Sequence, residues 1–295
     1  MKWMKGIGLL LIANILIMVT LSLTVPILIN VILPMFGIDV RDSVDLSSLV
    51  WAAMFGFGGA FISLAFSKQM ARAMLNCQQI IQPSSRAEQV VYGSVQEIAQ
   101  RLHITMPEVW VYDSPDPNAF ATGPSKNNSM VAVSTGLLQN LREDEVKAVL
   151  AHEMGHVYNG DMFATTVLAG LMNTFVYYIA MWVRRFFAER DQAALGFGLS
   201  LVLQIIVSIF ASIVISWFSR HREFGADAFA ARVYGKDSMI GALRAIDRWV
   251  NRAQFEYSTQ DALATMKISG KTGGLMSLFS THPPIEARIA ALEAL

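Results

Sequence analysis

The chain has 295 residues, of which 54% are hydrophobic and only 16% charged, with 23 basic and 23 acidic side chains. A soluble domain usually carries about 25% charged residues, so this composition argues against an ordinary soluble protein and against a disordered chain. The balanced charge gives no basic excess, so we expect no nucleic-acid partner. The single cysteine, Cys77, excludes an internal disulfide and a cysteine-rich zinc site, and we expect it to be a reduced, inert thiol.

Four long stretches of the chain contain no charged residue and consist mainly of aliphatic and aromatic side chains. They cover residues 6–38, 46–67, 162–183 and 192–219. A helix needs about 20 apolar residues to cross a bilayer, and the first stretch is too long for the apolar region of a signal peptide. We therefore predict four transmembrane helices arranged in two hairpins.

The distribution of basic residues predicts the orientation of these helices. Lys2 and Lys5 precede the first stretch, and Lys68 follows the second. The loop of the second hairpin contains three arginines, so the bias is weaker there, and whether this hairpin fully crosses the bilayer stays open. We expect the N-terminus and both polar segments to lie in the cytoplasm.

The spans divide the chain into four parts. We predict an N-terminal transmembrane hairpin over 1–66 and a second hairpin over 162–219. The polar segments 67–161 and 220–295 are together long enough to form one packed cytoplasmic domain.

The first polar segment has the pattern of a helix followed by strands and a second helix. Apolar residues at helical spacing predict a helix over Ala87–Leu102. A turn-rich segment at 123–129 separates two of three predicted strands, which are Glu108–Tyr112, Asn118–Thr122 and Met130–Ser134. Asn140 and Glu143 resemble a capping box that opens a helix running through Asn159. The fold class is therefore α+β.

This last helix contains the motif H-E-x-x-H. Its two histidines, His152 and His156, lie one helical turn apart on one face and can bind the same zinc ion. Glu153 would lie beside the open coordination position, where it can exchange protons with water and a leaving group. Gly155 is costly inside a helix and would allow another element to approach closely.

A catalytic zinc site usually needs a third protein ligand. No third histidine follows at short spacing, and the candidates after the fourth span are His221 and Glu223. Glu223 and Asp227 are four residues apart, so on a helix they share a face. Glu223 could bind the metal while Asp227 holds a zinc histidine. Two spans separate the motif from Glu223, which returns the chain to the same side of the membrane.

Four motifs together resemble the bacterial HtpX family. They are H-E-M-G-H at 152–156, R-E-F-G-A-D at 222–227, T-H-P-P at 281–284 and N-A-F-A-T-G at 118–123. Members of this family are integral-membrane zinc metalloproteases related to the CAAX prenyl endopeptidases. The resemblance covers essentially the whole chain.

The resemblance implies a role for each matching residue. It implies that His152, His156 and Glu223 bind one Zn²⁺ per subunit and that Glu153 is the general base. It also implies that the carboxylate of Asp227 contacts a zinc-binding histidine without binding the metal itself.

The resemblance also implies roles for residues outside the ligand set. His282 would stabilise the oxyanion of the tetrahedral intermediate, and Arg288 matches an arginine near the site. One strand would pair with an extended substrate through Asn118, Ala119, Phe120 and Ala121. Without the resemblance, His282 would be read as a residue at the entry of a helix.

The implied protein is a zinc metalloendopeptidase with a gluzincin-like cytoplasmic domain. It would be a multi-pass protein of the bacterial inner membrane that degrades damaged or misfolded membrane proteins under stress. Its partners would be the lipid bilayer and unfolded polypeptide or membrane-protein substrates; the substrates' identity and the oligomeric state stay open. The alternatives are a CAAX-type prenyl endopeptidase, which expects more spans, and a transporter or channel with a regulatory domain, which expects ionisable residues within the spans.

Overall fold

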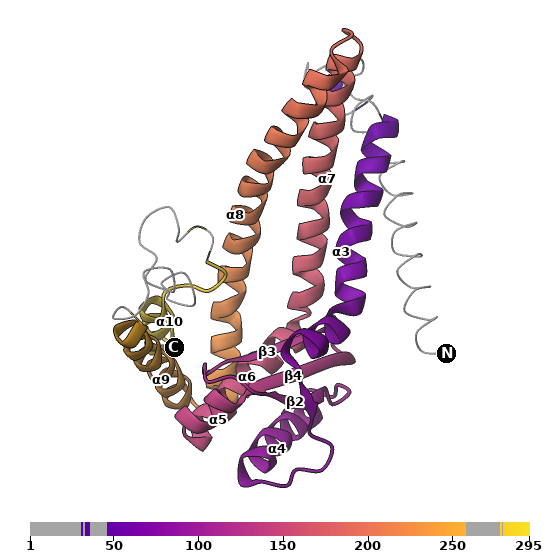
Figure 1. Cartoon of the computed structure of the whole chain (residues 1–295). Helices are drawn as coiled ribbons and strands as arrows, with labels where there is room; N and C mark the ends of the chain where they lie inside the picture. The colour runs from indigo at the N-terminus through magenta and orange to yellow at the C-terminus, as the bar shows by residue number, and fades with distance from the viewer. Residues whose placement is uncertain (1–30, 32, 36–45, 258–277, 279) are drawn as a thin grey trace. The chain divides into compact units, whose positions relative to one another are not determined.

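The computed structural model describes residues 31, 33–35, 46–257, 278 and 280–295 (Figure 1). In chain order the elements are α2 (Leu33–Met35), α3 (Leu46–Leu75), β1 (Gln78–Gln79), α4 (Arg86–Arg101), β2 (Glu108–Tyr112), β3 (Ala119–Ser125), β4 (Asn128–Ser134), α5 (Thr135–Asn140), α6 (Glu143–Asn159), α7 (Asp161–Ala188), α8 (Ala193–Tyr234), α9 (Lys236–Tyr257) and α10 (Ile285–Glu293). The fold is mostly helical with one small mixed sheet.

The chain divides into two compact units. The described parts of Met1–Ala65 and of Ala164–Ile215 form one, which we call the helix unit. The described parts of Phe66–Phe163 and of Ser216–Leu295 form the other, which we call the α/β unit.

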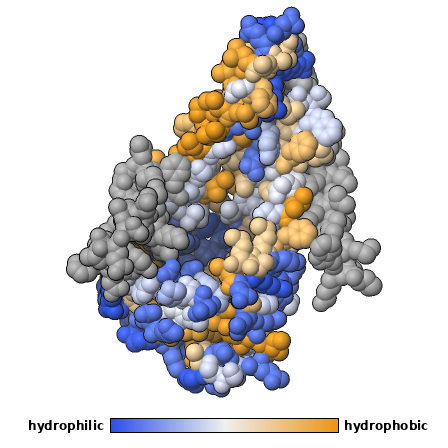
Figure 2. All heavy atoms as spheres, in the orientation of Figure 1, coloured by the Kyte–Doolittle hydropathy of each residue, from blue (hydrophilic) through white to orange (hydrophobic). Residues whose placement is uncertain are grey.

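Three of the described helices are long and apolar enough to cross a membrane. They are Ser47–Leu75 within α3, the whole of α7 and the apolar part of α8. Figure 2 shows apolar side chains gathered over α8, most of which are not covered by protein. The first predicted span, residues 6–38, lies almost wholly outside the described residues.

Small residues set the packing of α3 against α7 inside the helix unit. A Cβ atom at Gly56 would lie 2.6 Å from the backbone nitrogen of Thr174 and 2.9 Å from the carbonyl oxygen of Gly170. A Cβ atom at Gly170 would lie 2.4 Å from the ring of Phe57. Such close backbone approach is typical of helices that pack within membranes.

α8 continues without a break from apolar sequence into polar sequence. It runs from Ala193 to Tyr234, although the charged residues begin at Arg220. The segment that carries Glu223 is therefore part of the same helix as the apolar stretch before it.

The α/β unit is built on a four-stranded sheet with the order β1-β2-β4-β3. β2 runs parallel to β4, whereas β3 is antiparallel to β4 and β1 is antiparallel to β2. The strand predicted at Glu108–Tyr112 is confirmed as β2. β4 is central, and β3 forms one edge of the sheet.

Alternating residues of β4 contribute to the packing on both faces of the sheet. Val131 and Val133 face the main core, whereas Met130 and Ala132 pack with Tyr112 on the other face. Helices α4, α6, α9 and α10 contribute to the main core; its largest fully buried side chains include Ile98, Leu150, Met154, Met239, Leu243 and Leu292. This burial on both faces explains why the residues from Met130 to Val133 are all apolar and do not alternate with polar residues.

The β3–β4 hairpin differs from the prediction in its turn. The expected turn at 123–129 shrinks to two residues, because β3 continues to Ser125 and β4 begins at Asn128. The register shifts between Thr122 and Ser125, which marks a bulge. Gly123 lies there with φ of 146°, and a Cβ atom at this position would lie 2.3 Å from the carbonyl oxygen of Asn128. The edge position of β3 also accommodates Pro124.

The start of the motif helix was predicted wrongly. Asn140 ends the short helix α5 and does not cap α6, which begins at Glu143. The carboxylate of Glu145 accepts a hydrogen bond from the backbone N–H of Arg142 at 2.9 Å. The capping interaction therefore lies two residues further along than the sequence pattern suggested, because Leu141 adopts an extended conformation between the two helices.

The end of α3 is bound to the sheet by charged residues. Lys68 and Arg72 lie one turn apart on α3, and both form ion pairs with Glu108 of β2; the Lys68 contact is 2.7 Å. The guanidinium of Arg72 also lies 4.5 Å from the ring centre of Trp110.

Candidate metal centre

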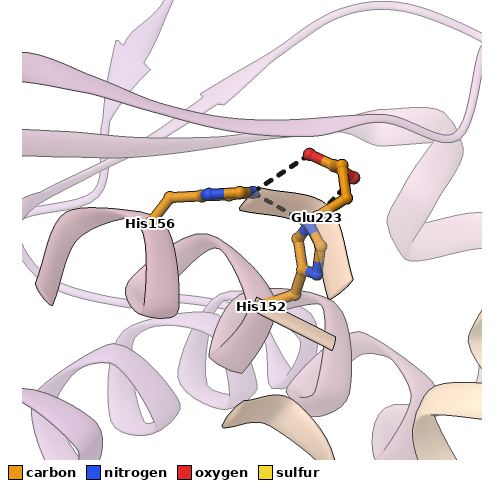
Figure 3. A group of neighbouring side chains, drawn as sticks. All are labelled: His152, His156 and Glu223. Atoms are coloured by element: carbon orange, nitrogen blue, oxygen red, sulfur yellow. Dashed lines mark hydrogen bonds and ion pairs between the residues drawn. The ribbon is translucent and has the colours of Figure 1, made fainter. Parts of the chain in front are cut away.

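Three side chains from two helices converge in the α/β unit. His152 and His156 lie on α6 and Glu223 lies on α8, and their ligand atoms are all within 4.8 Å of one another. The two Nε2 atoms are 3.1 Å apart, and Nε2 of His156 is 3.2 Å from Oε1 of Glu223. Figure 3 shows that all three side chains point toward one another.

The surroundings of the two imidazoles show which nitrogen is free. Nδ1 of His152 lies 2.9 Å from Oδ1 of Asp227, and Nδ1 of His156 lies 2.7 Å from Oδ2 of Asp161. A carboxylate can only accept, so each Nδ1 carries the proton and each Nε2 presents a lone pair. Two lone pairs and a carboxylate therefore face one another, which is a donor set that suits a cation. Two histidines and a glutamate are the ligands of many catalytic zinc sites, so these residues fit the metal that the motif implies.

The charged partners alter the pKa values of both histidines in the absence of metal. Burial disfavours the imidazolium of His152, but the contacts with Asp227 and Glu223 outweigh burial and raise its pKa. Burial acts in the same direction on His156, and the contacts with Glu223 and the charge of Glu153 again raise the pKa. The site thus favours positive charge.

Arg288 connects two of the carboxylates from the C-terminal helix α10. Its Nε and Nη2 atoms donate to Asp227 at 2.8 and 2.6 Å, and its Nη1 atom lies 3.2 Å from Oε2 of Glu223. The arginine is buried, as are both carboxylates. This bidentate contact fixes the orientation of Asp227, which in turn contacts His152.

His282 lies beside the ligand carboxylate. Its Nδ1 atom is 2.7 Å from Oε2 of Glu223, and its side chain is 63% exposed. The family resemblance implied a contact with the substrate oxyanion; the contact with Glu223 was not anticipated. With Nδ1 directed toward Glu223, Nε2 is the ring nitrogen left for a substrate.

Glu153 lies between the two histidines in the sequence of α6 and is half-buried. Its charge influences both His156 and Arg288. Within the described part of the chain its carboxylate forms no hydrogen bond or ion pair, so it is available for proton exchange.

The predicted close approach at Gly155 is confirmed. A Cβ atom at this position would lie 3.4 Å from the Cα atom of Ala226 and 3.2 Å from the ring of Phe229, both on α8. The glycine therefore brings α8 close to α6, which places Glu223 opposite the histidines.

The alternative third ligand, His221, takes no part in this group. Its Nδ1 atom lies 3.0 Å from the carbonyl oxygen of Trp217, and its ring lies against the indole at a tilt of 51°, with centroids 4.4 Å apart. It lies two residues from Glu223, which directs it to a different face of α8.

The predicted substrate strand lies next to the motif helix. β3 packs along α6 (Figure 1), and one of its edges pairs with none of the described strands. Ala119 and Ala121 face the main core, whereas Phe120 packs toward the opposite face beside Tyr112. Asn118 precedes the strand, and its backbone N–H donates to Ser134 at 2.9 Å.

Sequence reasoning missed Asp161 and its partner Arg222. Oδ2 of Asp161 contacts His156, and Oδ1 of Asp161 forms an ion pair with Arg222. The sequence did contain a signal for Asp161. Gly160 is a typical residue at the end of a helix, and the acidic Asp161 follows it directly, close to His156.

Known proteins are similar to this chain in sequence and in fold. Residues 85–295 match the family described as Peptidase family M48. The chain is 44% identical over 286 residues to Protease HtpX of Pasteurella multocida, covering 96% of this chain and 98% of that protein. It is 45% identical over 299 residues to Protease HtpX of Tolumonas auensis, covering 98% and 99%. The crystal structure of S. mikatae Ste24p has a similar fold, with a TM-score of 0.58 and 20% identity over 96% of this chain and 67% of that one.

Proposed function

The chain belongs to peptidase family M48 and, within it, to the HtpX proteases, so it is a membrane metalloprotease, and we propose that its metal is zinc. His152, His156 and Glu223 would hold one zinc ion per subunit. The observation that carries this proposal is the convergence of two imidazole nitrogens and a carboxylate, with each histidine held by an aspartate at its other nitrogen.

The proposed reaction is hydrolysis of an internal peptide bond. When bound, zinc polarises the scissile carbonyl and lowers the pKa of the attacking water. Glu153 would accept the proton of that water and later return it to the leaving amine. The absence of a hydrogen-bond partner for Glu153 among the described residues supports this role.

His282 would complete the site on the exposed side. Its Nδ1 atom is engaged by Glu223, so its Nε2–H would donate to the oxygen that becomes negative in the transition state. Asp227 and Arg288 would act behind the ligands by fixing His152 and Glu223 in place.

A substrate would bind as an extended strand along the edge of β3 that pairs with none of the described strands. Main-chain pairing is largely independent of side-chain identity, which suits a protease that acts on many unfolded chains. We infer that the substrates are damaged or misfolded membrane proteins, and that the active site faces the cytoplasm from the bacterial inner membrane. The CAAX-type alternative is not favoured, because the relatives that match nearly the whole chain are named Protease HtpX.

Metal content and proteolysis of the purified full-length protein test this proposal. We expect one zinc per chain, cleavage of casein, and loss of cleavage with a chelator that is reversed by added zinc. Glu223→Ala deletes a ligand and is expected to lose bound zinc together with activity. A wild-type protein that cleaves casein equally with and without chelator would refute the zinc mechanism.

A further inference from the structure

A second carboxylate–arginine pair lies behind the metal ligands, next to His156. Oδ2 of Asp161 lies 2.7 Å from Nδ1 of His156, and Oδ1 of Asp161 forms an ion pair with Nη2 of Arg222. The aspartate side chain is only 8% exposed, so solvent screens these contacts weakly. The guanidinium of Arg222 is further confined by the ring of Phe218, 5.8 Å away.

The turn after α6 brings Asp161 to the histidine. α6 ends at Asn159, and Gly160 adopts the left-handed conformation with φ of 70°. α7 then begins at Asp161 itself. A side chain at position 160 would be strained in this conformation, whereas glycine adopts it without steric strain.

The two histidines have matching surroundings. Asp227 with Arg288 holds His152, and Asp161 with Arg222 holds His156. In each case the aspartate accepts from Nδ1 and leaves Nε2 free. Arg222 contacts the other oxygen of Asp161, whereas Arg288 contacts both oxygens of Asp227. An arginine partner restrains the rotation of the carboxylate.

We propose that Asp161 and Arg222 are positioning residues for His156, and that Arg222 acts only through Asp161. The inference rests on the proposed zinc centre, because its consequence is the affinity of that centre for metal. Asp161 is the first residue of α7 and Arg222 lies on α8, so the two residues of the pair come from different helices.

Zinc affinity tests the pairing without relying on activity. The full-length protein in detergent or nanodiscs is titrated against a chromophoric chelator, and Co²⁺ substitution gives a visible spectrum that reports ligand geometry. Loss of a residue behind a metal ligand usually weakens metal binding 10–100-fold, and we expect this for Asp161→Ala. Arg222→Ala is expected to weaken binding by a smaller factor, and both variants are expected to change the cobalt spectrum.

A double-mutant cycle distinguishes the pair from two independent residues. If Arg222 acts through Asp161, then adding Arg222→Ala to Asp161→Ala causes no further loss of affinity. Asp161→Asn provides a second test if the alanine variant does not fold, because the amide retains an acceptor oxygen but no charge. In that background Arg222→Ala is again expected to have no effect.

Two control variants match the changes. Asp237 also lies in the first turn of its helix, α9, and Arg232 also lies on α8; both are exposed. Asp237→Ala and Arg232→Ala are expected to leave zinc affinity within a factor of about two, far below the 10–100-fold effect of a lost partner.

Three results would overturn the proposal. The first is wild-type affinity in both Asp161 variants, and the second is a full effect of Arg222→Ala in the absence of Asp161. The third is a wild-type protein that binds no zinc, with Glu223→Ala indistinguishable from it. Only this last result would also refute the zinc site itself, whereas the first two would leave it intact.

Discussion

The Nδ1 atom of His282 lies 2.7 Å from the Oε2 atom of Glu223, although the two residues come from separate parts of the chain. An exposed histidine is thereby fixed by the carboxylate that is proposed to bind zinc. The imidazole of His282 can hold Glu223 through Nδ1 and present Nε2 to a substrate. Its loss would therefore affect both the metal and the transition state.

We predict that His282→Ala lowers kcat by about 10²-fold, the usual effect of removing one oxyanion donor. Zinc affinity is expected to fall about tenfold, because Glu223 loses a partner. Steady-state kinetics on a quenched peptide at saturating zinc separate the two effects. Thr281→Ala, at the exposed neighbouring position, serves as control. An unchanged kcat at saturating zinc would remove His282 from the transition state.

Glu153→Gln is expected to keep zinc and lose proteolysis by ~10²–10⁴-fold, the usual contribution of a general base. The glutamine has nearly the same shape but cannot accept a proton. Metal analysis and peptide turnover on the same preparation provide the test. Substantial residual turnover with stoichiometric zinc would exclude Glu153 as the base.

The contact between α6 and α8 at Gly155 predicts different effects for two glycines. Gly155→Val would force the new side chain against Ala226 and Phe229, and we expect a loss of about 1–3 kcal/mol in the free energy of unfolding. Gly225→Ala is the control, because a Cβ atom there meets nothing within 4 Å, and alanine favours the helix. Thermal unfolding in detergent compares the two variants. Equal melting temperatures would contradict the close packing.

The ion pairs of Glu108 predict a dependence of stability on pH. Partial burial alone would raise the pKa of Glu108, but the hydrogen bond and charge of Lys68 and the charge of Arg72 outweigh it and hold the pKa below its ordinary value. The unfolded state therefore binds the proton first on acidification, so the stabilisation is complete above about pH 5 and is lost as the pH falls below ~4.3.

The corresponding variant is Glu108→Gln. We expect it to be less stable than wild type at pH 7 by at most about 1 kcal/mol, since the carboxylate is one-third exposed. The difference is expected to shrink as the pH falls through the pKa of Glu108 in the folded state. Thermal melts across this range, with the exposed Glu286→Gln as control, measure it. A difference that grows on acidification would have the wrong sign.

Cysteine labelling tests the proposed orientation of the second hairpin. In a Cys77→Ser background, Gln192→Cys lies in the turn between α7 and α8, and Asp237→Cys lies in the α/β unit. We expect a membrane-impermeant reagent to label position 192 in intact cells and position 237 only after permeabilisation. The reverse pattern would contradict a cytoplasmic active site.

Local patterns in the sequence were sufficient to predict those helices and strands that depend only on residues close together in the chain. The strand Glu108–Tyr112 was predicted with its observed bounds, because a proline precedes it and a break follows. Three of the predicted apolar stretches are helices long enough to span a membrane. The capping box at Asn140 failed, because several polar residues near a helix start satisfy the same pattern and only the backbone conformation of Leu141 selects among them.

The sequence by itself determined the local arrangement of the residues that are proposed to bind the metal. The spacing of His152 and His156 places both imidazoles on one helical face whatever surrounds the helix, and the helix period relates Glu223 to Asp227 in the same way. Only the tertiary structure decided which distant groups complete the site. The contact of Asp161 with His156 depends on the left-handed turn at Gly160 between α6 and α7.

The remaining contacts depend on how separate elements pack together. Arg288 reaches Asp227 because α10 packs beside α9 on the main core, and His282 reaches Glu223 from the loop before α10. Such contacts join residues far apart in the chain, and no periodic pattern encodes them. They follow from the burial of apolar surfaces across the whole unit, which is a collective property of the fold and not of any one segment.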